Sequence, residues 1–169
     1  SLTICSSGTL STGVGLNEVV LALPPYPTGS RESAQWVYQN YCARPESVTE
    51  DWVDSVMEVL QHSGYQAGVT KYVGEGLGVR LFLPDLARMK RETLTWISEG
   101  RLQRPVQMIW GANDRTVPIE RGLEMYELIA AHERRASFHV INDAGHFTFR
   151  EYPDRFSSLV ESFVNLCKA

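Results

Sequence analysis

The sequence has few of the features that mark a metal centre, a secreted protein or a membrane protein. Its 169 residues include only three cysteines, Cys5, Cys42 and Cys167, whose odd number and wide spacing give no metal motif and no disulfide framework. We therefore expect reduced thiols, a cytoplasmic protein, and neither a metal nor a cofactor. No apolar run approaches the roughly 20 residues that cross a bilayer. No basic segment followed by an apolar one marks a signal peptide.

The charge balance also excludes some partners. The formal net charge is −4, and 21% of the residues are charged. A protein that binds nucleic acid or an anionic membrane surface usually carries a basic patch, and none is visible here. The length fits a single domain, and there is no internal repeat or low-complexity tract. We therefore expect no nucleic acid and no membrane among the partners, and a small molecule as the substrate.

Apolar runs and helical periodicity alternate along the chain, most regularly in its second half. Strands are predicted at residues 2–5, 106–110 and 137–141. Helices are predicted at residues 31–43, 49–64, 86–98, 119–131 and 153–166. Residues 74–78 hold three glycines and are predicted to be flexible. The strand–helix–strand–helix order after residue 105 predicts parallel strands joined by a right-handed crossover.

An acid and a histidine follow the last two predicted strands. Asp114 lies four residues after Trp110, and His146 lies five residues after Ile141. In open α/β sheets, reactive groups lie on loops beyond the carboxyl ends of the strands. A histidine with one ring nitrogen held by a carboxylate can accept a serine proton at the other nitrogen. Taken alone, Asp114 would be a turn or cap residue, and His146 a loop residue bonded to backbone. Together they indicate catalysis.

The neighbours of these two residues fit the same interpretation. Gly111 permits a sharp exit from its strand, and Gly145 permits close approach of the backbone before the histidine. Asn113 and Asp143 are rivals for the acid, but Asn113 has no charge and Asp143 lies too near the strand end. The other histidines are predicted to have structural roles; they are His62, His132 and His139.

Residues 105–156 resemble the C-terminal part of an α/β-hydrolase, in which the acid and then the histidine of a Ser…Asp…His triad follow successive strands. Within that fold, the resemblance is nearest to meta-cleavage product hydrolases, which cleave a C–C bond in ring-opened aromatic dienoates. The residues that carry it are Thr95-Trp96-Ile97, Asp114-Arg115-Thr116-Val117-Pro118, Gly122-Leu123 and Gly145-His146. Phe147 stands where that family usually has a tryptophan.

This resemblance implies a fold class and a division of the chain into three parts. The class is α/β, the C-terminal portion of an α/β-hydrolase parallel sheet of about three strands, with a mainly helical cap. Residues 1–14 would be a core strand and turn, residues 15–85 the cap, and residues 86–169 the core that carries the acid and the histidine. Aromatic side chains available for a substrate pocket are Trp36, Tyr38, Trp52 and Trp96. Arg80 and Arg88 are candidates for binding a substrate carboxylate.

A nucleophile is not evident, because the chain has no Gly-x-Ser-x-Gly. The nearest pattern, residues 9–13, begins with Thr and is not followed by a helix, so Ser11 is predicted to be a turn serine. Ser6 and Ser7 are predicted to end a strand near the active site. A cysteine nucleophile paired with His146 would break the family order.

We therefore expect the serine to lie upstream, in an N-terminal half that the chain lacks. The complete enzyme would hydrolyse an ester, a related acyl group or a C–C bond next to a carbonyl. The chain alone would be inactive and unstable. It would pair with that N-terminal half or with a copy of itself as a homo-oligomer, or be part of a longer polypeptide. The alternative is a non-catalytic protein that binds a small molecule or a protein partner on the same fold.

Overall fold

A three-stranded parallel sheet carries the predicted site. The structure is a computed structural model that describes residues 1–11 and 24–168. The strands are β1 (Leu2–Cys5), β2 (Val106–Gly111) and β3 (Ala136–Ile141), in the order β1-β2-β3. Val106 pairs with Leu2 on one side and with Ala136 on the other. All three predicted strands are confirmed, and so is their parallel direction.

Helices cover both faces of the central strand, which explains why every residue of β2 is buried. Met108 and Trp110 point to one face, where they pack with Met125 of α6 (Ile119–Ala130) and Ile97. Ile109 points to the other face, toward α8 (Pro153–Leu166). Successive residues of a strand alternate between faces, so one apolar strand needs cover on both sides.

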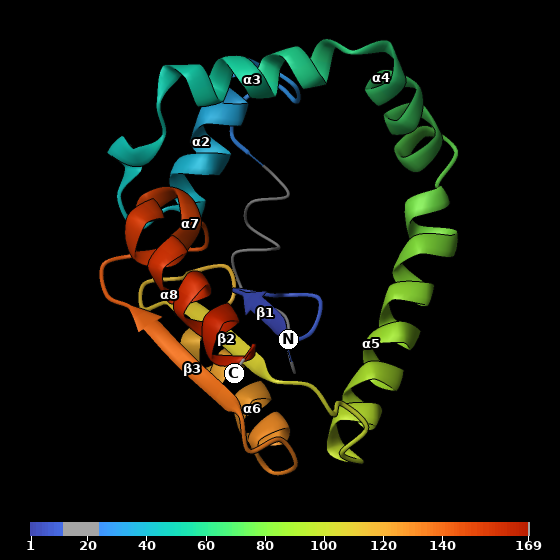
Figure 1. Ribbon diagram of the computed structural model, residues 1–169. Coiled ribbons are helices and arrows are strands. Elements are labelled where there is room, and N and C mark those ends of the chain that lie inside the picture. The colour runs from blue at the N-terminus through green and yellow to red at the C-terminus, as the bar shows by residue number, and fades with distance from the viewer. Residues whose placement is uncertain (12–23, 169) are drawn as a thin grey trace.

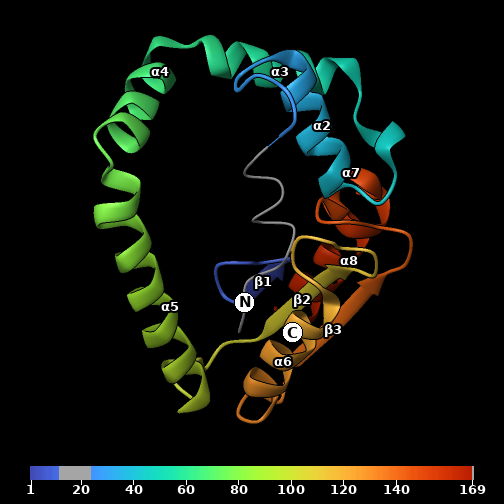
Figure 2. The same cartoon turned by 180° about the vertical axis from the view of Figure 1, so that it is seen from behind.

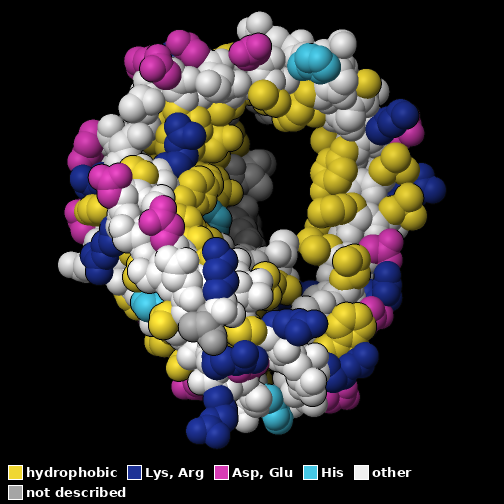
Figure 3. All heavy atoms as spheres, in the orientation of Figure 1, with side chains coloured by type: hydrophobic (Ala, Val, Ile, Leu, Met, Phe, Trp, Pro, Cys, Tyr) yellow, Lys and Arg dark blue, Asp and Glu magenta, His cyan; other side chains and the backbone are white. Residues whose placement is uncertain are grey.

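A chain of helices forms an arch that leaves the sheet at α2 and returns through α5 (Figures 1 and 2). Its elements are α2 (Arg31–Tyr41), η1 (Pro45–Ser47), α3 (Glu50–Gln61), α4 (Ser63–Val69), η2 (Thr70–Gly74), η3 (Gly78–Phe82) and α5 (Leu83–Ser98). Figure 3 shows an opening between the arch and the sheet with hydrophobic side chains on its rim. The predicted cap, residues 15–85, takes in the arch as far as the start of α5, and its residues 15–23 lie outside the described residues. Its division from the core stays a prediction.

Two helices of the arch begin as their N-terminal residues dictate. The Ser30 hydroxyl accepts a hydrogen bond from the Ser33 amide, and the Thr49 hydroxyl accepts one from the Trp52 amide. Each bond satisfies an amide that has no partner within its own helix. The predicted helix starts at residue 31 and after Thr49 are therefore confirmed.

Two predicted helix boundaries along the arch were wrong, and the turns beside the glycine-rich stretch were not predicted. The second helix ends at Gln61, because His62 is extended and its Nδ1 accepts from the Gly64 amide to start α4, so Gly64 lies inside a helix. In the glycine-rich stretch, Gly74 ends the π-helical turn η2 and Gly78 begins the π-helical turn η3, with Gly76 between them at φ +65. Finally, α5 begins at Leu83, three residues before the predicted start.

Candidate active site

Asp114 and His146 lie side by side at the carboxyl edge of the sheet, on the loops that follow β2 and β3. The Oδ2 atom of Asp114 is 2.9 Å from Nδ1 of His146. The Asp114 side chain is fully buried, whereas the His146 side chain is 21% exposed. A buried carboxylate that holds one ring nitrogen leaves the other nitrogen available at the surface of the site.

The loop after β2 fixes the orientation of the Asp114 carboxylate. Its Oδ1 atom accepts hydrogen bonds from the amides of Thr116 (2.8 Å) and Val117 (2.9 Å). Accepting amides of its own turn is what an isolated loop aspartate commonly does. Here these bonds also direct the other carboxylate oxygen, Oδ2, toward His146. The rival Asp143 is turned elsewhere, because its Oδ2 accepts from the Tyr152 hydroxyl at 3.0 Å.

The two glycines allow the loops to pack backbone against backbone. A Cβ atom on Gly111 would overlap the carbonyl oxygens of Ala144 and Gly145. A Cβ atom on Gly145 would lie 2.5 Å from the Tyr41 carbonyl oxygen and 2.5 Å from the Ala43 amide nitrogen. Both glycines are therefore required by close approach, and neither has a positive φ.

The end of α2 also contacts His146. The His146 amide donates to the Tyr41 carbonyl at 2.8 Å, and the two rings lie 5.3 Å apart. The next residue, Phe147, packs with the cap aromatics Tyr38 and Trp52 at ring distances of 5.9 and 5.4 Å. The arch is thus joined to the histidine loop by a backbone bond and by an aromatic cluster.

No hydroxyl or thiol of the described residues is hydrogen-bonded to the second ring nitrogen of His146. The Ser11 hydroxyl donates to the Gly8 carbonyl at 2.9 Å, as in a turn; Thr12 and Gly13 of the same pattern lie outside the described residues. Ser6 follows β1 with φ +40, and its buried hydroxyl has no partner in the described part of the chain.

The thiols near the sheet and the cap are poor nucleophiles. Cys5 is hydrogen-bonded to the Thr148 hydroxyl at 3.1 Å, and burial raises the pKa of its thiol. Burial raises the pKa of Cys42 to about 12. The thiolate is the reactive form of cysteine, so both groups are largely unreactive near neutral pH. All three cysteines are free of disulfides.

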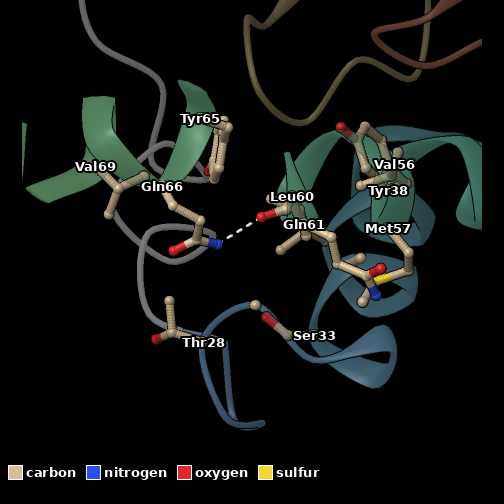
Figure 4. Close-up of a pocket in the computed structure, with 13 residues that line it drawn as sticks. Thr28, Ser33, Tyr38, Val56, Met57, Leu60, Gln61, Tyr65, Gln66 and Val69 are labelled. Atoms are coloured by element: carbon tan, nitrogen blue, oxygen red, sulfur yellow. Dashed lines mark hydrogen bonds between the residues drawn. The ribbon is translucent and has the colours of Figure 1, made fainter. Parts of the chain in front are cut away.

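The cap contains a cavity of about 440 Å³ between α2, α3 and α4. Figure 4 shows Tyr38, Val56 and Met57 on one side of it and Tyr65, Gln66 and Val69 on the other. Of the four aromatics expected in a pocket, Tyr38 lines this cavity. Trp52 packs against Tyr38 with ring centroids 4.9 Å apart, and Trp96 is 49% exposed beside Arg101.

Neither candidate for binding a carboxylate lines the cap cavity. The Arg88 guanidinium forms ion pairs with Asp85 (3.3 Å) and Glu92 (2.9 Å) on its own helix. Arg80 lies exposed in η3, and no carboxylate of the described residues forms an ion pair with it. Arg80 is therefore the better placed of the two to accept an added anion.

Sequence reasoning missed one charged residue of the site. The buried carboxylate of Glu151 accepts hydrogen bonds from the loop that carries His146 and from the end of α2. Glu151 belongs to a short helix, α7 (Thr148–Glu151), that was not predicted either. An acid five residues after a candidate histidine, just before Tyr-Pro, was the available signal.

Within the described residues, no group of three His, Cys, Asp or Glu side chains is placed to hold a metal ion. In the same part of the chain, no helix is both long enough and apolar enough to span a bilayer.

The sequence has curated relatives, although no protein-family model matches it. It is 37% identical over 65 residues to a 2-hydroxy-6-oxononadienedioate/2-hydroxy-6-oxononatrienedioate hydrolase of Klebsiella pneumoniae, and the match covers 38% of this chain and 21% of that protein. It is 35% identical over 83 residues to the enzyme of that name from Escherichia coli strain K12, covering 49% of this chain and 23% of the relative. The matches thus span less than a quarter of the relatives.

Solved structures resemble nearly the whole chain. The meta-cleavage product hydrolase CumD of Pseudomonas fluorescens IP01 superposes with a TM-score of 0.67 at 20% identity, over 96% of this chain and 54% of that one. The 2-hydroxy-6-oxo-6-phenylhexa-2,4-dienoate hydrolase BphD of Rhodococcus sp. strain RHA1 gives 0.67 at 19% identity, with the same coverage. At these identities the likeness establishes the fold, which is that of an α/β-hydrolase.

Proposed function

We propose that this chain, which has the α/β-hydrolase fold and meta-cleavage product hydrolases among its relatives, supplies the acid and the histidine of a serine hydrolase. Asp114 would orient His146, and the nucleophilic serine would come from outside these 169 residues. The substrate would be an ester, a related acyl compound, or a C–C bond next to a carbonyl as in meta-cleavage products. The observation that carries the proposal is the 2.9 Å contact between the buried Asp114 carboxylate and His146 Nδ1.

The geometry supports a two-step reaction. Asp114 keeps the proton on Nδ1, so Nε2 can take the serine proton while the serine Oγ attacks the carbonyl carbon. The tetrahedral intermediate then collapses, the bond to the leaving group breaks, and the imidazolium returns its proton to that group. Water next attacks the acyl-serine with His146 as base and releases the carboxylic acid. In C–C cleavage the leaving group departs as a carbanion and is protonated on carbon.

The cap cavity suggests where an apolar part of the substrate could bind. Among the described residues its lining is mainly aliphatic and aromatic, with the amide side chains of Gln61 and Gln66 and no Lys or Arg. A ligand pocket of this kind binds apolar groups and uses a few polar atoms for orientation. A substrate carboxylate would therefore bind outside this cavity, and Arg80 stays the candidate.

The test is hydrolysis by the full-length protein with an activated ester and with a ring-opened dienoate. His146→Ala and Asp114→Asn are each expected to lower kcat by about 10⁴-fold, since each breaks the acid–histidine pair. His132→Ala, which changes an exposed histidine at the end of α6, is the control and should leave the rate unchanged. Equal rates for the wild type and His146→Ala would refute the assignment.

A second candidate function is binding without catalysis. It is favoured by the finding that no nucleophile of the described residues reaches His146. In that case the full-length protein would bind small apolar ligands and hydrolyse none of them. A serine, cysteine or aspartate at a strand-to-helix turn upstream would decide for the enzyme.

Two further expectations remain proposals. We infer that β1 pairs with another strand in the complete protein, either from an N-terminal half or from a second copy of this chain. A cavity of about 240 Å³ beside β1 supports this, because it is lined by Leu2, Ile4, Leu10, Trp96 and other residues of an apolar face. A cytoplasmic location is proposed from the free thiols alone.

A further inference from the structure

Glu151 is a buried acid that holds backbone rather than a cation. Its residue is 5% exposed, and its Oε1 atom accepts a hydrogen bond from the Gly145 amide at 2.7 Å. Its Oε2 atom accepts from the Ala43 amide at 2.8 Å and from the Arg44 amide at 3.3 Å. Within the described residues, no Lys, Arg or His nitrogen lies within ion-pair distance of this carboxylate. The charge is therefore met by three backbone N–H groups, which makes these bonds stronger than neutral ones.

These bonds close a ring between two segments that are distant in sequence. One segment is the exit from α2, and the other is the loop that precedes His146. Besides the carboxylate, the ring includes the His146 amide bonded to the Tyr41 carbonyl at 2.8 Å, and Arg44 Nη2 bonded to the Glu151 carbonyl at 2.9 Å. Glu151 is thus a shared anchor for the cap and the histidine loop.

The position of His146 depends on this anchor more than the position of Asp114 does. Asp114 is fixed by the amides of its own turn, at Thr116 and Val117. The histidine loop is held by other segments: the His146 amide bonds to Tyr41, and the Gly145 amide bonds to Glu151. Its Ala144 carbonyl also accepts from the Asn113 amide at 2.9 Å. Loss of the bond from Gly145 to Glu151 would remove one of these restraints and let His146 move away from Asp114, whose carboxylate stays bonded to the amides of its own turn.

We propose that Glu151 is a positioning residue that holds His146 against Asp114 and locks the first cap helix to the histidine loop. The catalytic part of this inference rests on the proposed function. The anchoring part does not, because it concerns the Gly145 and Ala43 amides alone.

The variant that tests this proposal most directly is Glu151→Gln in the full-length protein. Glutamine has nearly the same shape but one acceptor oxygen, so its NH₂ group must face either the Gly145 amide or the amides of Ala43 and Arg44. We expect kcat to fall by about 10²-fold, the effect of a small misplacement of a catalytic group, with a much smaller change in KM. Glu151→Asp keeps both acceptor oxygens on a shorter side chain and should recover part of this loss.

The matched control is Glu133→Gln. Glu133 is also a buried acid that accepts from a backbone amide, that of Arg135 at 2.8 Å, although it also pairs with the Arg135 guanidinium at 3.1 Å. It lies in the turn before β3, at the end of that strand away from His146. A purely structural effect would make the two variants alike, with similar losses of melting temperature and kcat values close to the wild type. That outcome, or an unchanged kcat in Glu151→Gln, would overturn the proposal.

A second measurement does not depend on activity. Amide hydrogen exchange should become at least tenfold faster at Gly145, Ala43 and His146 in Glu151→Gln, with no such change in Glu133→Gln. Unchanged exchange at these amides would overturn the anchoring role, whatever the kinetics. If the wild type hydrolyses nothing but exchange rises as expected, the proposed function fails and the anchor stands.

Discussion

At the scale of single residues, the site depends on the absence of side chains as much as on their presence. Gly111 has no room for a Cβ atom, because the carbonyl oxygens of Ala144 and Gly145 occupy that space. These carbonyls belong to the loop that carries His146, and Gly111 is the last residue of β2, directly before the loop that carries Asp114. The distance between the two loops is therefore set by glycine backbone.

We expect Gly111→Ala to lower the free energy of unfolding by about 1–3 kcal/mol, the usual effect of overpacking a rigid site. It should also separate Asp114 from His146, because backbone must move to admit the methyl group. Urea unfolding would measure the first effect. Gly68→Ala is the control, since an added Cβ there has no neighbour within 4 Å, and alanine in a helix should stabilise by up to about 1 kcal/mol. Equal effects of the two changes would contradict this account.

At the scale of elements, α3 is anchored through its N-terminal half and is more exposed toward its C-terminal end. Val53 is 1% exposed and packs with Cys42, Val48 and Trp52, whereas Val59 is 57% exposed. The Arg150 guanidinium also lies 4.2 Å from the centre of the Trp52 ring, which joins α3 to α7. The N-terminal half of α3 thus packs against the core, and its C-terminal half extends along the arch.

Valine-to-alanine changes at Val53 and Val59 should show the different packing of these two halves of α3. Val53→Ala is expected to lower the free energy of unfolding by about 2 kcal/mol, because it removes two buried methyl groups and leaves a cavity. Val59→Ala should stay within about 0.5 kcal/mol of the wild type. Chemical denaturation of both variants is the measurement, and a loss at Val59 as large as that at Val53 would show that the exposed face is covered.

The elements that the sequence predicts well are those determined by local rules. Buried apolar runs locate the three strands, and Ser30 and Thr49 locate two helix starts. The π-helical turns around Gly76 and the short helix α7 were missed, because their geometry depends on what surrounds them. Of the site, Asp114 and His146 were predicted and lie in contact, although their catalytic role stays a prediction. The role of Glu151 could not be predicted, since its partners at Ala43 and Arg44 are more than a hundred residues away.

At the scale of the whole molecule, the arch and the sheet leave apolar surface uncovered. Leu2, Val79, Phe82 and Trp96 are each at least 40% exposed in the described structure. In the described residues β1 pairs only with β2, so no described strand pairs with its other edge. Unpaired strand edges and large apolar patches promote association.

We therefore expect the 169-residue chain, purified by itself, to associate with a copy of itself or to aggregate, and to lack hydrolase activity. Light scattering and intact mass would measure this. Adding a separately produced N-terminal half should yield a defined complex and restore activity. A well-folded monomer of about 19 kDa with esterase activity would overturn both this expectation and the assignment of Ser11 as a turn residue.

The pairing of β1 with β2 also determines how freely the length of the cap can change. Thr3 and Gln107 face each other in the sheet, yet they are 104 positions apart along the chain. The entropy lost when the ends of so long a connection are brought together grows only with the logarithm of its length, so doubling it would add about 0.6 kcal/mol. The distal arch can therefore gain or lose residues at little thermodynamic penalty, whereas its base at Tyr41–Arg44 cannot, because Glu151 and His146 hold it.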